Sequence, residues 1–138
     1  MSTPEESKRI ARLFFDTLCA GDFEGGFGRM MTDDATWSVI GTTSVSLTRD
    51  KAGMMGDQLE MLKTFREGPF IGIDEMIAEG NRVVVLAHCH GVGPTGPYKQ
   101  DRYAFVMRLR DGKVAEVVEY LDTVAVETGI CGNRVVPA

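Results

Sequence analysis

The chain of 138 residues contains little of what metal sites, disulfide frameworks and nucleic-acid-binding surfaces require. It has only two histidines and three cysteines, Cys19, Cys89 and Cys131, and no two cysteines are spaced as CxxC. This pattern argues against a disulfide framework and against a cysteine-based zinc site. We expect Cys19 and Cys89 to be small buried apolar residues and Cys131 to be an exposed thiol.

Lysine and arginine are scattered along the chain, and the formal net charge is -5. Without a basic block or stripe, we expect no nucleic-acid partner. No segment approaches the roughly 18 consecutive apolar residues of a membrane helix, and the N-terminal residues lack the apolar core of a signal peptide. We therefore expect a cytoplasmic protein without a membrane partner.

The composition is that of a folded protein, since hydrophobic residues make up 43% and charged residues 25% of the chain. The length is typical of one domain that can bury a core and still enclose a pocket. We expect a single domain over residues 1–138, with a core of about 5–128 and a tail over 129–138.

The first half of the chain predicts helices. Thr3, Pro4 and Glu6 have the spacing of a capping box with proline at the first helical position, and apolar residues then recur at helical intervals until Gly21. A short helix is expected over 23–31.

A strand centred on Trp37 and a longer helix complete this half of the chain. The apolar, β-branched segment 33–41 predicts the strand. Thr48 can cap the helix over 49–65, and Gly68-Pro69 would end it.

The second half predicts strands at 70–79, 82–91, 98–110 and 113–121, followed by a short helix at 123–129. Glycine-containing turns join the first two strands and the last two, as in antiparallel hairpins. Helices followed by antiparallel strands indicate an α+β fold. A curved sheet wrapped against the helices would leave a conical cavity, where we expect the functional site.

Both histidines lie in the predicted strand VVVLAHCHG, where His88 and His90 share one face and Cys89 has the opposite one. They can form part of a metal site, half of an acid–base pair, or hydrogen-bonded core residues. With Asp101 they would make a two-histidine, one-carboxylate set. Because the chain has no third histidine and no helical metal motif, we expect no metal.

Alternation along 98–110 predicts which side chains meet His88. The odd-numbered residues are mostly apolar, so the odd face is expected to be the inner one, which turns Asp101 inward. A loop that folds symmetrically would place His88 opposite Asp101, and His90 opposite Lys99 near the rim. An imidazole beside a carboxylate in an apolar cavity can have a pKa close to neutral, which suits acid–base catalysis.

The last strand offers a second carboxylate, and its identity depends on the turn at 111–112. A two-residue turn would place Asp122 opposite Asp101. A bulge at the turn would shift the register by one and bring Glu119 inward instead. Asp122 can also serve only as the cap of the final helix, so both assignments remain open.

Two segments, ARLFFDTLCAGDFEGGFGRMMTDDATW and DRYAFVMRLRDGKVAEVVEYLDT, carry a resemblance to known proteins. They resemble the nuclear transport factor 2-like superfamily, and the second resembles its SnoaL-like (polyketide-cyclase-like) branch. The resemblance covers about residues 5–128. It implies a cone-shaped α+β fold in which a strongly bent antiparallel sheet wraps around N-terminal helices, commonly as a homodimer through the outer face of the sheet.

The resemblance also limits the chemistry. The oxyanion-hole tyrosine and catalytic aspartate of the steroid isomerases correspond to Phe14 and Val39, which excludes that reaction. The epoxide-hydrolase pattern matches only in part. His88 stands where that pattern has an inward aspartate, and Glu119 stands where it has the aspartate of the last strand. The acid–base aspartate of the polyketide cyclases corresponds to Asp122.

Together these observations predict a small-molecule enzyme of SnoaL-like type. We expect cofactor-independent acid–base chemistry, of isomerase, cyclase or dehydratase/hydrolase type, on a largely apolar molecule that bears a carbonyl or hydroxyl group. The expected acid–base residues are His88, Asp101, and Asp122 or Glu119. The residues expected to line the pocket are Trp37, Phe14, Phe65, His90, Tyr103 and Phe105. The alternative is a non-catalytic ligand-binding or dimerisation domain.

Overall fold

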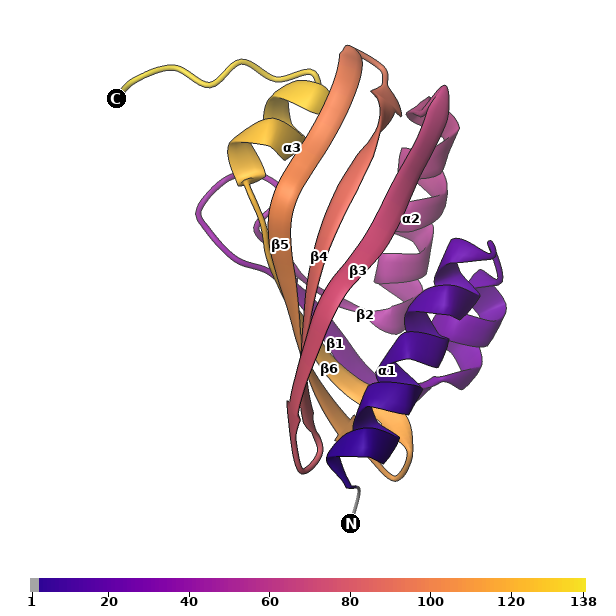
Figure 1. Cartoon of the computed structure of the whole chain (residues 1–138). Helices are drawn as coiled ribbons and strands as arrows, with labels where there is room; N and C mark the ends of the chain where they lie inside the picture. The colour runs from indigo at the N-terminus through magenta and orange to yellow at the C-terminus, as the bar shows by residue number, and fades with distance from the viewer. Residues whose placement is uncertain (1–2) are drawn as a thin grey trace.

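The computed structural model describes residues 3–138 and shows a curled six-stranded sheet with α1 and α2 on one side (Figure 1). The elements in chain order are α1 (Pro4–Cys19), η1 (Glu24–Arg29), β1 (Met31–Val39), β2 (Thr48–Asp50), α2 (Lys51–Thr64), β3 (Glu67–Glu79), β4 (Arg82–Gly93), β5 (Gly96–Arg110), β6 (Lys113–Tyr120) and α3 (Thr123–Gly129). The strand order is β2-β1-β6-β5-β4-β3. The predicted α+β fold with a bent sheet is confirmed, with one parallel pair, β1 and β6, in the otherwise antiparallel sheet.

The N-terminal helix α1 begins as the sequence predicts. The backbone N–H of Glu6 donates to the Thr3 hydroxyl at 3.2 Å, and the Glu6 carboxylate accepts from the backbone N–H of Thr3 at 3.5 Å. This capping box satisfies backbone donors that the first turn of a helix otherwise leaves unpaired. The helix buries Phe14 and Phe15 against the sheet.

The segment after α1 forms one π-helical turn, η1, in place of a regular helix. Its glycines allow this close packing, because a Cβ atom at Gly26 would lie 2.3 Å from a methyl carbon of Leu18. The backbone N–H of Gly25 donates to the Asp22 carboxylate at 2.8 Å, which ties the first turn to the residues before it.

Helix α2 begins later than the sequence predicts, and the expected Thr48 cap is wrong. Thr48 belongs to β2, which pairs with β1 through Ser38. Asp50 caps the helix instead, because its carboxylate accepts from the backbone N–H of Gly53 at 2.7 Å.

The turn between β5 and β6 has two residues, which is one of the two alternatives that the sequence left open. Arg110 pairs with Lys113, and Asp111 and Gly112 have φ angles of 51° and 75°. Positive φ at both central residues is typical of the type I′ turn, whose twist matches that of paired antiparallel strands.

Beyond this turn, a bulge in β6 changes the register. Leu109 pairs with Val114, but Arg108 pairs with Glu116, so β6 carries one extra residue. An extra residue reverses the face on which all later side chains lie. As a result Glu119, rather than Asp122, lies on the inner face of the sheet.

A second bulge lies between β4 and β5. Ala87 pairs with Tyr103, but Cys89 pairs with Gln100, so β5 has one more residue than β4 between these pairs. The inner face of β5 therefore changes from odd-numbered residues such as Tyr103 to even-numbered residues such as Gln100.

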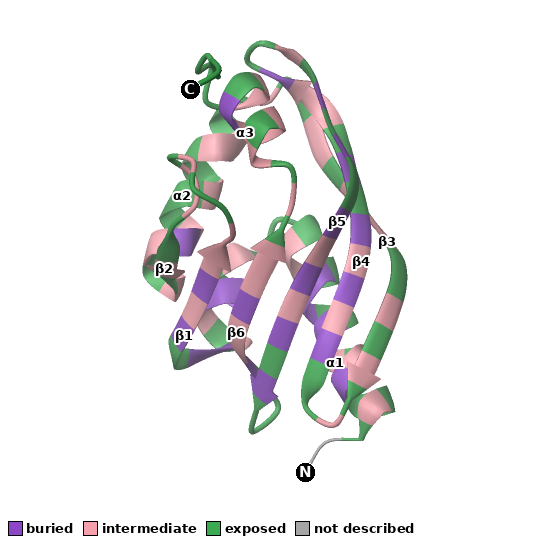
Figure 2. Cartoon of the chain, turned by 90° about the vertical axis from the view of Figure 1, so that its left-hand side faces the viewer, coloured by how far each residue is buried: buried purple, intermediate pink, exposed green. Residues whose placement is uncertain are grey.

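The core lies between the helices and the inner face of the sheet. An aromatic cluster occupies its centre, with ring centroids of contacting pairs 4.7–6.4 Å apart. Its members are Phe14, Phe15, Phe27, Trp37 and Phe105. Figure 2, which views the sheet from the side opposite α1, shows buried and more exposed residues alternating along β4 and β5. Within residues 3–138, none of the helices has the length and apolar character needed to cross a membrane.

Candidate active site

A cavity of about 740 Å³ lies between the inner face of the sheet and α2. This volume falls within the range of small-molecule sites in proteins. Most of the side chains that line it are apolar or aromatic. They include Phe15, Leu18, Trp37, Met54, Met61, Phe65, Tyr103, Phe105 and Leu121.

The loop after β1 and the region of α3 close another side of the cavity, to which Val45 and Val126 contribute. Glu127 of α3 holds these two segments together, because its carboxylate accepts hydrogen bonds from Ser44 and, at 2.7 Å, from Asn133.

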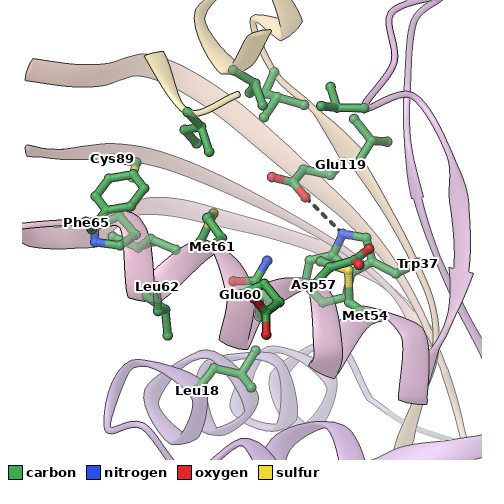
Figure 3. Close-up of a pocket in the computed structure, with 18 of the residues that line it drawn as sticks. Leu18, Trp37, Met54, Asp57, Glu60, Met61, Leu62, Phe65, Cys89 and Glu119 are labelled. Atoms are coloured by element: carbon green, nitrogen blue, oxygen red, sulfur yellow. Dashed lines mark hydrogen bonds between the residues drawn. The ribbon is translucent and has the colours of Figure 1, made fainter. Parts of the chain in front are cut away.

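Glu119 is the carboxylate that the sheet directs into this cavity. It lies on β6 between Phe105 of β5 and Val39 of β1. The indole N–H of Trp37 donates to Glu119 Oε1 at 2.9 Å. Figure 3 shows this hydrogen bond at one end of the cavity, with Phe65 and Cys89 towards the other.

Burial raises the pKa of Glu119 from its ordinary value of 4.5 to about 7, and the Trp37 hydrogen bond opposes only part of this effect. Glu119 keeps some accessible surface because it lines a cavity, and the apolar lining around it disfavours its charged form. Burial disfavours the charged carboxylate, whereas a donated hydrogen bond favours it. At neutral pH both the acid and the carboxylate are populated, which is the condition for efficient proton transfer.

The other charged residues lining the cavity lie at its mouth and are paired. Arg49 Nε lies 2.8 Å from Asp57 Oδ2, and Glu60 Oε1 lies 2.9 Å from Lys63 Nζ. Within residues 3–138, Glu119 is the one charged residue of the cavity lining without an ionic partner. The same residues contain no group of three or more side chains placed to hold a metal ion.

Cys89, Tyr98 and Tyr103 also line the cavity. Burial raises the pKa of the Cys89 thiol to about 11, and it raises the pKa of both phenols above their ordinary value of 10. The negative charge of Glu119 raises all three further. The thiol and the phenols are therefore neutral at physiological pH, and the phenols can donate hydrogen bonds.

The structure brings five of the ten sequence-predicted residues to the cavity. These are Trp37, Phe65, Tyr103, Phe105 and Glu119. Phe14 does not reach it, because it is fully buried behind Trp37, with the two ring centroids 6.2 Å apart.

The predicted inward pair of His88 and Asp101 is wrong. Both residues lie on the outer face of the sheet, because the β5 bulge reverses the alternation that was expected to turn Asp101 inward. His88 Nδ1 lies 2.8 Å from Asp74 Oδ1 on β3, and Asp101 Oδ1 lies 3.1 Å from Lys99 Nζ.

His90 is paired with Lys99 as predicted, but it does not shape the entrance of the cavity. It lies on the outer face, with its ring centroid 5.4 Å from that of Phe70. The pairing of β4 with β5 was therefore predicted correctly near the loop that joins them. The prediction of which face of these strands lies towards the cavity was wrong.

Asp122 caps α3 and is not opposite Asp101. Its carboxylate accepts from the backbone N–H groups of Val124 and Ala125 at 3.0 and 3.2 Å. The bulge in β6 therefore decides between the two alternatives, giving Glu119 to the cavity and leaving Asp122 at the helix N-terminus.

Sequence reasoning missed Cys89, Tyr98 and Gln100 as inner-face residues. One local signal exists: Tyr98 and Gln100 are uncharged, whereas Lys99 and Asp101 between and beside them are charged. In this short segment the even-numbered residues are the uncharged ones, whereas in residues 103–109 the odd-numbered residues are the apolar ones. This change from even to odd marks the position of the bulge.

The raised pKa of Glu119 predicts a pH-dependent stability. Between about pH 4.5 and 7 the folded state holds a proton that the unfolded state has lost, so the free energy of unfolding falls as pH rises through this window. We expect a decrease on the order of 1 to 3 kcal/mol that is absent from Glu119→Gln. Urea unfolding across the window measures it, and parallel curves for the two proteins would contradict the assignment.

Comparisons with known proteins agree with this architecture. The family model of the SnoaL-like domain matches residues 11–117. An NTF2-like protein from Burkholderia xenovorans LB400 is 25% identical, with a TM-score of 0.74 over 93% of this chain and 98% of that chain. A comparison with curated protein sequences gives no significant match.

Two further solved structures share the fold at lower identity. PrhC from Penicillium brasilianum NBRC 6234 is 16% identical, with a TM-score of 0.80 over 91% of this chain and 86% of that chain. TerC, co-crystallised with polyporic acid, is 22% identical, with a TM-score of 0.76 over 91% of this chain and 98% of that chain. Since the family model spans more than half of the sequence and the curled sheet matches these structures, the chain belongs to the SnoaL-like domain family of the NTF2-like superfamily.

Proposed function

We propose that this chain is a small-molecule enzyme that performs cofactor-independent acid–base chemistry, with Glu119 as the group that takes up and returns a proton. The observation that carries the proposal is the Glu119 carboxyl group, which has a pKa of about 7 in an otherwise apolar cavity of about 740 Å³. His88, Asp101 and Asp122 have no part in it, because the structure places their side chains outside the cavity.

The proposed substrate is a largely apolar molecule with a carbonyl or hydroxyl group. In its charged form, Glu119 takes a proton from a carbon next to the carbonyl, and in its neutral form it returns a proton to the same or a neighbouring atom. The Trp37 N–H fixes the carboxylate and stabilises its charged form. This chemistry serves isomerisation, cyclisation, dehydration or hydration.

The comparisons support binding of a small organic molecule. TerC, which shares the fold, was co-crystallised with polyporic acid. The aromatic lining of the present cavity suits a largely apolar organic ligand.

The second candidate is a ligand-binding domain that keeps the cavity but performs no catalysis. The apolar lining supports this function equally well, and the position of Glu119 favours catalysis. Proton exchange distinguishes the two.

We predict that the protein catalyses exchange of the methyl protons of naphthyl methyl ketone with deuterium from solvent, measured by NMR. Glu119→Gln keeps the size of the side chain but cannot take up the proton, so the rate should fall on the order of 10²-fold or more. For the wild-type protein, the rate should rise with pH through about 7, as Glu119 ionises.

Glu116→Gln is the matched control, because Glu116 lies on the same strand and pairs with Arg108 at 3.9 Å, away from the cavity. Its exchange rate should equal that of the wild type. An equal rate for Glu119→Gln would contradict the acid–base role. A wild-type protein that binds the ketone without exchanging its protons would favour the ligand-binding function.

We also propose that the chain forms a homodimer through the outer face of the sheet. Four aliphatic residues make one row across β3, β4, β5 and β6, because each pairs with the next: Ile77, Val84, Val106 and Val118. Ile77 at its end is 53% exposed. A second copy that packs on this row would remove it from water.

Light scattering after gel filtration tests the dimer. The wild type should have the mass of two chains, and Val106→Glu, which places a charge in the row, should have the mass of one. Leu13→Glu is the control, because Leu13 is an exposed apolar residue on α1. A monomeric wild type would contradict the proposal.

A further inference from the structure

A buried side chain, Gln100 of β5, bonds to both backbone groups of Asp122. Gln100 is 2% exposed. Its Nε2 donates to the Asp122 carbonyl oxygen at 2.9 Å, and its Oε1 accepts from the Asp122 backbone N–H at 3.0 Å. Because a carbonyl oxygen can only accept and an amide N–H can only donate, these two bonds fix the orientation of the Gln100 amide.

The fixed amide determines the direction of a second hydrogen bond. The same Nε2 lies 2.9 Å from the hydroxyl oxygen of Tyr98, so the amide donates and Tyr98 accepts. The proton of the Tyr98 hydroxyl must therefore point away from Gln100. Within residues 3–138 no side chain or backbone group accepts it.

Tyr98 lines the cavity, and its ring is held on two sides. The ring centroid of Phe65 lies 5.8 Å away in an edge-to-face contact. A Cβ atom at Gly129 would lie 3.0 Å from Tyr98 Cδ1, so the backbone of α3 packs directly on the ring. The ring has little room to turn, and the hydroxyl keeps its position.

Tyr98 faces the same space as Glu119. Both residues line the cavity, and the charge of Glu119 acts on the Tyr98 phenol, whose pKa burial already raises. The phenol therefore keeps its proton at physiological pH. Tyr98 on β5 thus gives the cavity a hydrogen-bond donor, and Glu119 on β6 gives it a proton acceptor.

We propose that Tyr98 donates a hydrogen bond to the carbonyl oxygen of the substrate, and that Gln100 is a positioning residue that turns the Tyr98 proton into the cavity. This inference rests on the proposed function and names its substrate class, an apolar ketone. The ketone oxygen reaches Tyr98, while the carbon beside the carbonyl reaches Glu119.

The proton balance of this arrangement is simple. Glu119 takes the proton from the carbon, so a C–H bond breaks and the O–H bond of the carboxylic acid forms. The electron pair moves to the ketone oxygen, where the Tyr98 hydroxyl stabilises the developing negative charge. Return of the proton to the same or a neighbouring carbon regenerates the carboxylate.

Two probes of nearly equal shape test the inference, namely naphthyl methyl ketone and ethylnaphthalene, which lacks the oxygen. Wild-type protein should bind the ketone roughly tenfold more tightly, the ratio that one hydrogen bond supports. Tyr98→Phe should bind both probes equally. The infrared C=O band of the bound ketone should lie at lower frequency in the wild type than in Tyr98→Phe.

Gln100→Leu tests the positioning role, because it keeps the Tyr98 hydroxyl but removes the group that orients it. The ketone preference should shrink, and the C=O band should move towards that of Tyr98→Phe. The matched control is Tyr120→Phe, since Tyr120 is a 48% exposed tyrosine outside the cavity. Its ketone preference and C=O band should equal those of the wild type.

The same ketone preference and the same C=O band in wild type and Tyr98→Phe would overturn the inference, as would a wild type without ketone preference. The proton-exchange experiment distinguishes a failure of the Tyr98 inference from a failure of the proposed acid–base function of Glu119. If Glu119→Gln exchanges at the wild-type rate while Tyr98→Phe loses its ketone preference, ketone binding stands and the acid–base role falls. If Glu119→Gln loses proton exchange while Tyr98→Phe keeps the wild-type ketone preference, the acid–base role of Glu119 stands and the role of Tyr98 falls.

Discussion

The hydrogen bond from Trp37 to Glu119 is the interaction on which the candidate site depends, because Arg49, the one cation of the cavity lining within residues 3–138, pairs with Asp57 instead. A buried carboxylate is costly unless it is paired, hydrogen-bonded or protonated. Here one indole N–H at 2.9 Å offsets part of the cost, and protonation near neutral pH removes much of the rest. The aromatic cluster around Trp37 holds the donor in place.

The other charged residues of the cavity lining differ from Glu119 in their exposure to solvent and in their ionic pairing. Arg49, Asp57 and Glu60 lie at the mouth and have ionic partners in contact with solvent, so their charges are screened. Glu119 is less exposed than Asp57 and Glu60, and within residues 3–138 it has a hydrogen-bond donor, Trp37, but no ionic partner. Among the carboxyl groups of the cavity lining, Glu119 is therefore the one whose pKa burial brings to about 7.

Much of the fold follows from local sequence patterns. The capping box at Thr3, the break at Gly21 and the hairpins at the glycine-containing turns each depend on residues close in sequence, and the structure confirms them. The start of α2 was misplaced, because β2 uses Thr48 to pair with a strand ten residues away.

The site was less predictable, because bulges change which residues face inward without a strong sequence signal. One extra residue in β5 moved Asp101 and His88 to the outer face, and one in β6 exchanged Asp122 for Glu119. Tyr103 and Phe105 were assigned correctly, because residues 103–109 of β5 alternate regularly up to the edge of the bulge. The change of phase around Gln100 is the signal of the β5 bulge in the sequence, whereas near the β6 bulge the sequence left two alternatives open.

The titration of Glu119 tests the central claim most directly. The carboxyl carbon of Glu119, followed by NMR in protein labelled with carbon-13 and assigned through Glu119→Gln, reports its protonation as pH is varied. This account predicts a midpoint near 7. A midpoint near 4.5, the ordinary value for glutamate, would contradict it.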